Sequence, residues 1–509
     1  MKRNLILALA ASVPFLAACS GGSNNNGDTA TVASDALCPS SMDYSTVWTG
    51  GSGSGEVVKF QLDTTKLTWQ MTFLDSFVPL AKGTAKPSRE GETLSGTMTR
   101  ETELPTQNLN NCTFRLNSAY VTGTSTSGVD TFNDGESQPA RIFIGQGIMG
   151  GMIPGKEIQF NGIDIAASAE NTILGSEISS ALTSLGLSSS SVTTLIDQAI
   201  GVNGDGIVAE IPDVTLRYIP FLAFSSVNTN LSSAMSTLAS ESPFTQLGFS
   251  LEATRNFAVN AIQAKWTFNS DGSYTKCDTF GQNAGKCVAS NTADPEDSSV
   301  TDNKPFVSTT DGSSVFETDN YQGQEPPYQL PALVADLYPG ANAAAGKGFL
   351  ILGNVNGGLV PLFIRRGVVN IPTLIGGTDS TANVDDEIGI SLMFPQTTIA
   401  QGGVDGEYIT VDSVLNATTS NPGGVDDQFN YRAILLVGTE ATIIDPFNAS
   451  DAATADALNI GYTQSTPGSL TVQNTTTGGN GTMIFGNHAV AYLDNSGSTP
   501  YFTAGAFVQ

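Results

Sequence analysis

Histidine is the scarcest titratable residue of this chain, which has only His488. A Ser–His–Asp relay needs an imidazole base beside its nucleophile, and the sequence has no G-x-S-x-G elbow to supply that nucleophile. A zinc site of the H-E-x-x-H type needs two histidines. These absences disfavour serine hydrolases and exclude this class of zinc enzyme. We expect His488, at the start of an apolar run in "FGNHAVAYL", to lie in a turn or at the surface.

Positive charge is also scarce, because 21 Lys and Arg residues face 48 Asp and Glu residues, for a net charge of −27. A strongly acidic protein repels nucleic-acid phosphates and anionic lipid head groups. We therefore exclude nucleic acid as a partner and leave membrane attachment to a lipid anchor. The pair Arg365-Arg366 in "LFIRRGVV" is a local exception, which we expect at a solvated hairpin end.

Long apolar runs are absent after the amino-terminal segment, so no later transmembrane helix is expected. That first segment has Lys2 and Arg3, then an apolar run from Leu5 to Phe15 that is too short to span a bilayer. Small residues and Cys19 follow in "PFLAACSGGSNNNG". This order of charge, apolar run, small residues and cysteine resembles the lipobox of bacterial lipoproteins.

The resemblance implies that residues 1–18 are a signal peptide and that Cys19 is the lipidation site. Its thiol would take a diacylglycerol and its amino group a fatty acid such as palmitate, and each buried methylene would add about 0.8 kcal/mol of membrane affinity. Ser20 at the next position favours the outer membrane in that family, on either its periplasmic or its outer side. The alternative is an ordinary signal peptide that leaves Cys19 a free thiol. Residues 19–40 are small and polar, as in a flexible tether.

Cysteine is rare in the rest of the chain, with four residues after Cys19. An even number in an exported protein indicates two disulfides. We favour Cys277–Cys287, because both lie on one short hairpin-like unit, and this choice leaves Cys38–Cys112. The other two pairings stay open. A four-cysteine metal site is disfavoured because no C-x-x-C motif occurs.

Alternating apolar residues predict a mainly β fold. "VVKFQLD" places Val58, Phe60 and Leu62 on one face, and "KLTWQMTFLD" does the same for alternate residues from Leu67 to Phe73. The pair Asp271-Gly272 predicts a type I′ hairpin turn. We expect a multi-stranded antiparallel protein, propeller-like or a tandem sandwich, with further strands at Leu94–Arg100, Thr113–Thr122 and Arg141–Met149.

A small helical insertion is expected at about 170–240, within an amino-terminal β region that spans 41–287. Helical spacing of apolar residues occurs at 177–201 and again at 229–240. Residues 288–328 are polar and acidic, which indicates a linker or long loop. A carboxy-terminal β region would then span 329–509.

Two long stretches share the same order of features. Each has an apolar strand, a turn with Asn and Gly, a Pro two residues before a Phe, and then a Gly before an apolar end. They are "GKGFLILGNVNGGLVPLFIRRGVV" and "GNHAVAYLDNSGSTPYFTAGAFV", and "PARIFIGQGIMGG" is a looser third copy. Duplicated β-units are one interpretation. The other is chance, because glycine-rich β proteins produce such echoes readily.

Metal and carboxylate chemistry have weak signals only. The loop "GVNGDGIVAEIPD" at 201–213 is similar to the middle of an EF-hand through Asn203 and Asp205, but Gly201 and Pro212 occupy the two positions that need carboxylates. We expect no cofactor, with Ca²⁺ as the weak exception. A glycan hydrolase needs two carboxyl groups at a set spacing. The acidic stretches at 385–387 and 426–427 are expected to be solvated loops.

These observations predict an acyl-anchored outer-membrane lipoprotein, similar to the many uncharacterised lipoproteins of the cell envelope. Its expected role is non-catalytic: binding of a glycan, peptide or envelope protein through a β scaffold, or a structural role. The alternative is a carboxylate-dependent glycan hydrolase.

Overall fold

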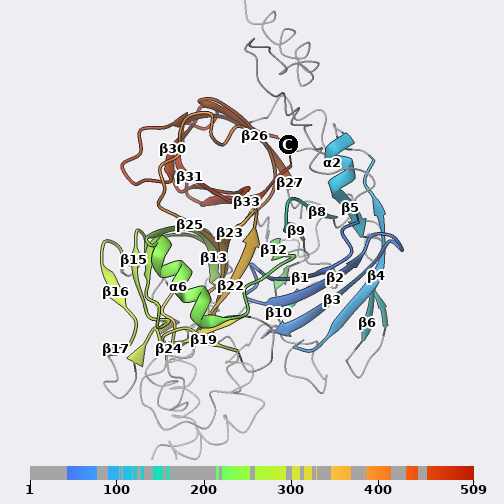
Figure 1. Ribbon diagram of the computed structural model, residues 1–509, viewed down its shortest axis with the longest axis horizontal. Helices are drawn as coiled ribbons and strands as arrows, with labels where there is room; N and C mark the ends of the chain where they lie inside the picture. Colours follow the sequence, from blue (N-terminus) through green and yellow to red (C-terminus); the bar gives the residue numbers. More distant parts are fainter. Residues whose placement is uncertain are drawn as a thin grey trace, which may run out of the picture. The chain divides into compact units, whose positions relative to one another are not determined.

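The computed structural model describes a large part of the chain after residue 42. The described residues are 43–76, 90–102, 104, 107–116, 119–122, 128–130, 141–152, 158–160, 214–216, 220–252, 258–281, 283–293, 301–309, 315–323, 328–329, 346–367, 383–384, 387–413, 431–444 and 456–508. They form antiparallel strands almost throughout, which confirms the mainly β prediction. Three units follow one another along the chain (Figure 1).

The first unit, here called the N-terminal barrel, is a ring in which each strand pairs with the next. Strand β3 pairs with β4, and β12 pairs back with β1, so the ring closes. Strands β6 (Ala119–Thr122) and β7 (Gly128–Asp130) extend from β4, and α2 (Gln107–Cys112) precedes β5. A separate pair is β10 (Ile158–Phe160) with β11 (Val214–Leu216). The ring strands are β1 (Val47–Ser52), β2 (Val57–Asp63), β3 (Thr68–Asp75), β4 (Thr93–Arg100), β5 (Thr113–Leu116), β8 (Arg141–Ile144), β9 (Ile148–Met152) and β12 (Pro220–Phe224).

The second unit, the middle sheet, has nine strands in the order β16-β15-β14-β13-β25-β23-β22-β20-β19. The pairing of β25 with β13 joins two meanders, β13–β16 and β19–β25, into one open sheet whose edges are β16 and β19. The strands are β13 (Phe244–Glu252), β14 (Ala258–Phe268), β15 (Tyr274–Asp278), β16 (Cys287–Ala289), β19 (Val307–Ser308), β20 (Phe316–Asp319), β22 (Lys347–Val355), β23 (Gly358–Arg366) and β25 (Glu387–Pro395). Two small pairs accompany them, β17 (Thr292–Ala293) with β18 (Thr301–Asp302) and β21 (Tyr328–Gln329) with β24 (Asn383–Val384).

The third unit, the C-terminal barrel, is an up-and-down barrel that Figure 1 shows end-on as an orange-red ring. Each strand pairs with the next, and β33 pairs with β26 to close it. Its strands are β26 (Gly406–Asp412), β27 (Tyr431–Val437), β28 (Glu440–Ile444), β29 (Asp456–Gly461), β30 (Ser469–Asn474), β31 (Asn480–Gly486), β32 (Ala489–Asp494) and β33 (Tyr501–Phe507).

The period-two pattern of β2 and β3 is confirmed. Val58, Phe60 and Leu62 are buried, whereas Lys59 and Gln61 are exposed. Trp69, Met71 and Phe73 are buried on β3, and Phe60 stacks on Trp69 with ring centroids 5.7 Å apart. Asp63 lies opposite Thr68, so β2 and β3 form a hairpin. Burial of one face thus sets the register, since a slip by one residue would expose every one of these side chains.

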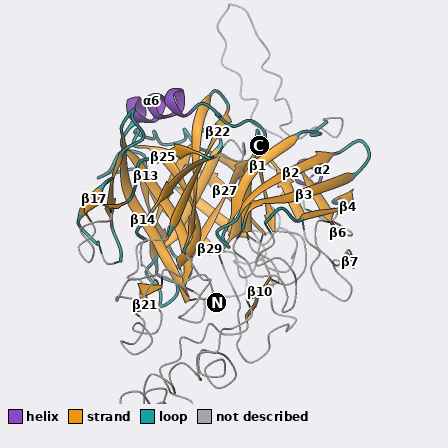
Figure 2. Cartoon of the chain, turned by 90° about the horizontal axis from the view of Figure 1, so that it is seen from below, coloured by secondary structure: helices purple, strands orange, loops and turns teal. Residues whose placement is uncertain are grey.

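The expected helix at 229–240 is present as α6 (Leu231–Glu241). The Asn230 side chain accepts a hydrogen bond from Ser233 N at 2.9 Å and so caps the amino terminus. Ala234, Met235 and Leu238 are buried against the aromatic cluster of the middle sheet, which includes Trp266. Figure 2 shows α6 across one end of those strands. The other helix prediction, 177–201, lies outside the described residues.

The three units share one apolar core. On β13 all nine residues are buried, because alternate residues face the aromatic cluster of the middle sheet and the others face the neighbouring barrels. Phe249 of β13 packs on Phe502 of β33 with centroids 5.8 Å apart. Gly145 packs against Ala506, and Gly51 against Ile364, so closely that a Cβ atom on either glycine would collide. The shared core requires small residues where strands of different units cross.

Three details differ from the sequence predictions. Two closed barrels and one open, half-closed sheet replace propeller blades or sandwiches, because β4 pairs back with β3 and β33 with β26, whereas β16 and β19 are the edges of the middle sheet as described. In the described part of 288–328, β17 and β18 pair with each other and β19 and β20 extend the edge of the middle sheet, so this part includes strands of the β structure. At the Asp271-Gly272 hairpin only Gly272 has a positive φ, of 90°, so the turn is not type I′.

The three echoed stretches form hairpins in three different units. They correspond to β8–β9, β22–β23 and β32–β33. Asn356 and Gly357 have φ values of 47° and 80° in the β22–β23 turn. One hairpin in each unit is compatible with duplication of a β-unit, which stays a hypothesis.

Candidate functional site

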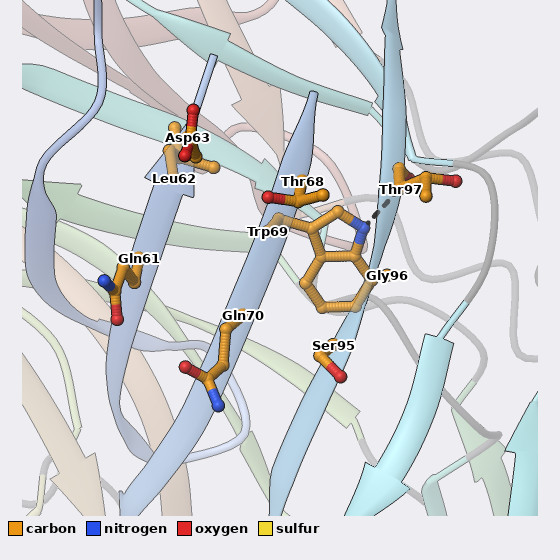
Figure 3. A pocket seen from close by; sticks show the side chains of 9 residues that line it. All are labelled: Gln61, Leu62, Asp63, Thr68, Trp69, Gln70, Ser95, Gly96 and Thr97. Atoms are coloured by element: carbon orange, nitrogen blue, oxygen red, sulfur yellow. Dashed lines mark hydrogen bonds between the residues drawn. The ribbon is translucent and has the colours of Figure 1, made fainter. Parts of the chain in front are cut away.

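A groove of about 480 Å³ lies on the N-terminal barrel across β2, β3 and β4 (Figure 3). It is lined by Gln61, Leu62, Asp63, Thr68, Trp69, Gln70, Ser95, Gly96 and Thr97. The solvent-facing members of this set are all polar, and the apolar members point into the barrel. The groove therefore offers amide, hydroxyl and carboxylate groups to a ligand.

Strand register arranges these polar side chains in two rows. Gln61 lies opposite Gln70, and Gln70 lies opposite Ser95. Directly opposite residues of antiparallel strands share a face, so these side chains form a row with about 4.7–4.9 Å between strands. Asp63, Thr68 and Thr97 form the second row in the same way.

The backbone between the two rows is held by Trp69. Its indole reaches across Gly96, which has no side chain, and Nε1 donates a hydrogen bond to the Thr97 carbonyl at 3.1 Å (Figure 3). Trp69 is only 2% exposed, so it is unable to stack on a ligand. Its role at the groove is to join β3 to β4 from the inner face.

Asp63 is the only carboxylate in the lining of this groove. Lys66 Nζ lies 2.7 Å from Asp63 Oδ2, and Lys66 N donates to Oδ1 at 2.8 Å. The hydrogen bonds from the Lys66 side chain and backbone lower the pKa of Asp63 to about 2. This group stays ionised at neutral pH, so it is unsuited to protonate a leaving group.

A second polar site lies inside the middle sheet, around Tyr321. Lys276 Nζ lies 3.0 Å from Asp278 Oδ2, and both side chains are almost completely buried. The cations of Lys276 and Arg365 lie 4.7 Å and 5.0 Å from the centre of the Tyr321 ring. Burial raises the pKa of Tyr321, and the Asp278 carboxylate raises it further. Tyr321 is therefore protonated at neutral pH and lies beside two cations, of which Lys276 is paired with Asp278.

Two buried glutamates lie in this sheet as a facing pair. Glu252 of β13 is opposite Glu387 of β25, and both are at most 3% exposed. A Cβ atom on Gly323 would collide with the Glu387 carboxylate and lie close to Arg365. The prediction that Glu387 lies in a solvated acidic turn is wrong, because β25 begins at this residue and turns its side chain inward.

The prediction that Arg365 and Arg366 form a solvated hairpin end is also wrong. Arg365 is 2% exposed inside the middle sheet, where Nη1 donates to the Arg366 carbonyl at 3.1 Å. Arg366 points to the other face and forms an ion pair with Asp75 of the N-terminal barrel. Strand alternation thus sends the two cations to separate buried partners.

A comparison with protein-family models matches residues 68–506 to DUF2957, described as a protein of unknown function. The chain belongs to this family. The match begins at the first residue of β3 and ends in β33, so it includes strands of all three units. A search of curated proteins finds no match.

In this DUF2957 chain, the disulfide Cys277–Cys287 joins directly opposite residues of β15 and β16. Cys112 is also disulfide-bonded, but Cys38 lies outside the described residues, so the Cys38–Cys112 pairing stays a prediction. Cys19, the proposed lipidation site, and the weak calcium ligands Asn203 and Asp205 lie outside the described residues as well.

Within the described ranges of this DUF2957 chain, no group of three or more His, Cys, Asp or Glu side chains is arranged to hold a metal ion. No helix in those ranges is long and apolar enough to cross a membrane. His488 lies in the turn between β31 and β32, with a φ of 64°.

Sequence reasoning placed Thr68 and Gln70 on the solvent face of a strand but did not recognise a binding surface there. The available signal was the β2–β3 hairpin itself, since its turn sets Gln61 opposite Gln70. The third strand of the groove was predicted, but its register against β3 was not. Polar residues that alternate on one strand do not indicate a site until the neighbouring strand is known.

Proposed function

We propose that this DUF2957 protein is an acyl-anchored lipoprotein of the outer membrane that binds a glycan without cleaving it. The groove across β2, β3 and β4 carries the proposal, because its two rows of Gln, Ser and Thr side chains both donate and accept hydrogen bonds. Sugar hydroxyl groups need the same mixture of donors and acceptors. The amino-terminal residues through Cys19 supply the anchor in this proposal.

Binding without hydrolysis follows from the carboxylate content of the groove. Glycoside hydrolysis needs two carboxyl groups, of which one is protonated. The groove has Asp63 alone, and its pKa of about 2 keeps it ionised. A ligand at this site would therefore be held by hydrogen bonds and released unchanged.

The groove is tested by glycan binding of the full chain in detergent. The double variant Gln61→Ala/Gln70→Ala removes two amides of one row, and each lost hydrogen bond should weaken binding by roughly threefold to tenfold. The matched control is Gln473→Ala, which removes an exposed amide from β30 of the C-terminal barrel. The probes are an immobilised glycan array and soluble peptidoglycan fragments. Equal retention of a bound glycan by the double variant and the wild type would refute the proposed groove.

The anchor is tested separately by metabolic labelling with an alkyne-bearing palmitate. The wild type should carry the label and sediment with outer membranes, and Cys19→Ser should lose the label and appear in the soluble fraction. Protease treatment of intact and lysed cells then separates a surface position from a periplasmic one. A labelled Cys19→Ser chain would exclude this cysteine as the lipidation site.

The alternative function is carboxylate-dependent glycan hydrolysis, and the facing pair Glu252 and Glu387 favours it. Opposite residues of paired strands have Cβ atoms about 4.5–5.5 Å apart, so these two side chains start close together on one face of the sheet, and glycoside hydrolysis needs two carboxyl groups near each other. Release of reducing ends from peptidoglycan by the wild type, lost in Glu387→Gln, would support this function. Absence of release by the wild type, with binding retained, would support the binding function.

A further inference from the structure

The interior of the C-terminal barrel is apolar at one end and polar at the other. The apolar end contains Leu436, Ile460, Leu470, Phe485 and Val490. Residues two apart on a strand face the same side, so the alternation that turns these apolar residues inward also turns the residue at the other end of most strands inward. That residue is polar in most strands. This polar end consists of Asp412, Arg432, Asp456, Asn474, Asp494 and Tyr501.

Negative charge is in excess at the polar end. Arg432 Nε donates to Asp412 Oδ2 at 3.0 Å, so these two charges neutralise each other. Asp456 and Asp494 are half-buried, and no Lys or Arg of the described ranges forms an ion pair with either. Ser496 donates to Asp494 Oδ1 from its N at 2.9 Å, which fixes the position of this carboxylate.

Two tyrosines, Tyr492 and Tyr501, lie among these carboxylates. Tyr492 is 1% exposed, and its ring lies 5.9 Å from that of Tyr501 at an angle of 59°. The Oη atom of Tyr492 is buried beside the Asp494 carboxylate, and no N–H or O–H of the described residues donates a hydrogen bond to it. Burial raises the pKa of Tyr492, and the carboxylates of Asp494 and Asp456 raise it further, so both lie near its hydroxyl. The lone pairs of this buried oxygen would be satisfied by a ligand that donates a hydrogen bond.

Carboxylates, phenol oxygens and aromatic faces all stabilise one kind of group, an organic cation with N–H donors. The carboxylates supply charge, the Oη lone pairs accept hydrogen bonds, and the rings offer their negative faces. A bare metal ion fits less well, because no cluster of three metal-binding side chains occurs in the described part of the barrel. We propose that the polar end of the C-terminal barrel binds a small molecule that carries a primary ammonium group.

The first test is calorimetric titration of the full chain in detergent with cadaverine, a primary diamine. The matched probe 1,5-pentanediol has the same carbon chain and no charge. Saturable binding of cadaverine without binding of the diol is the expected result. N-acetyl-lysine amide then tests whether an ammonium group on an amino acid is accepted as well as one on a free diamine. No binding of cadaverine, or equal binding of the diol, would overturn the proposal.

Substitutions locate the site. Asp456→Asn removes one carboxylate charge at nearly constant volume and should weaken cadaverine binding about tenfold or more. Tyr492→Phe removes only a hydroxyl group and should weaken cadaverine binding several-fold. If Asp456→Asn fails to fold, the cadaverine affinity of Tyr492→Phe tests the location of the site. The control Glu440→Gln removes an exposed carboxylate from the outer face of β28 and should bind like the wild type. A loss of the same size in all three variants, or in none, would refute this location.

Discussion

Arg366 of β23 forms an ion pair with Asp75 of β3 and so joins the middle sheet to the N-terminal barrel. The two side chains are only 16% and 23% exposed. Burial lowers the pKa of Arg366 to about 10, and the Glu56 carboxylate acts in the opposite direction. The guanidinium stays charged at neutral pH, so its closest carboxylate matters for stability.

Replacement of Asp75 by Asn should therefore destabilise the protein by about 3 kcal/mol, because it leaves a buried cation without its closest counter-charge. Arg366→Met should cost a similar amount, whereas the double variant should cost clearly less than the sum. Urea unfolding of the four proteins measures this. Additive losses would mean that the two side chains act independently.

The Cys277–Cys287 disulfide closes a short loop, with a sequence separation of 10. Loop-closure entropy predicts that the double variant Cys277→Ser/Cys287→Ser loses roughly 3 kcal/mol of unfolding free energy. The measurement is the urea midpoint, with a mass-spectrometric thiol count to establish that Cys112 stays oxidised. An unchanged midpoint would show that β15 and β16 hold this hairpin without the bond.

The Asn487-His488 turn places two residues in the left-handed region, with φ values of 46° and 64°. Asn-Gly suits such a two-residue turn best, so His488→Gly should raise the unfolding free energy by roughly 0.5–1 kcal/mol. His488→Ala is the matched control, since it removes the same ring and keeps the strained backbone. A higher melting temperature for His488→Ala than for His488→Gly would contradict this explanation.

His488 also predicts a dependence of stability on pH. Burial lowers its pKa below the usual 6.5, and Nδ1 has no hydrogen-bond partner among the described residues. The unfolded chain therefore binds a proton first as the pH falls. The contribution of His488 is complete above about pH 6.5 and is lost on acidification through the lower folded-state pKa.

His488→Gln removes this titration and keeps a polar side chain. The difference in unfolding free energy between the wild type and His488→Gln should be constant above pH 7 and should shift against the wild type as the pH falls below 6.5. Urea unfolding at a series of pH values tests this. A difference that does not change with pH would contradict it.

Local structure was predictable where one face of a strand or helix is buried and the other is exposed to solvent. Val58, Phe60 and Leu62 alternate with exposed residues, and α6 buries Ala234, Met235 and Leu238 on one stripe. Both patterns depend only on neighbouring residues, so the sequence carries them fully. The disulfide Cys277–Cys287 was predictable for the same reason, because a single hairpin brings the two residues together.

Closure into rings was not predictable, because alternation is the same in a propeller blade, a sandwich and a barrel. The deciding pairs, such as β26 with β33, join residues far apart in the chain. Burial on both faces also removes the alternation from β13 and β25. Arg365, Arg366 and Glu387 were expected in solvent because their partners are equally distant in sequence. The groove was missed for this reason too, since it needs the register of three strands.

The core that all three units share has a consequence for how this chain tolerates cutting. A fragment with one unit alone would expose core side chains such as Phe249, Phe502 or Ile364 to water. Such a fragment would expose a large apolar surface and aggregate, so we expect no single unit of this protein to be stable alone. Any shortened form of this chain would therefore have to keep the three units together.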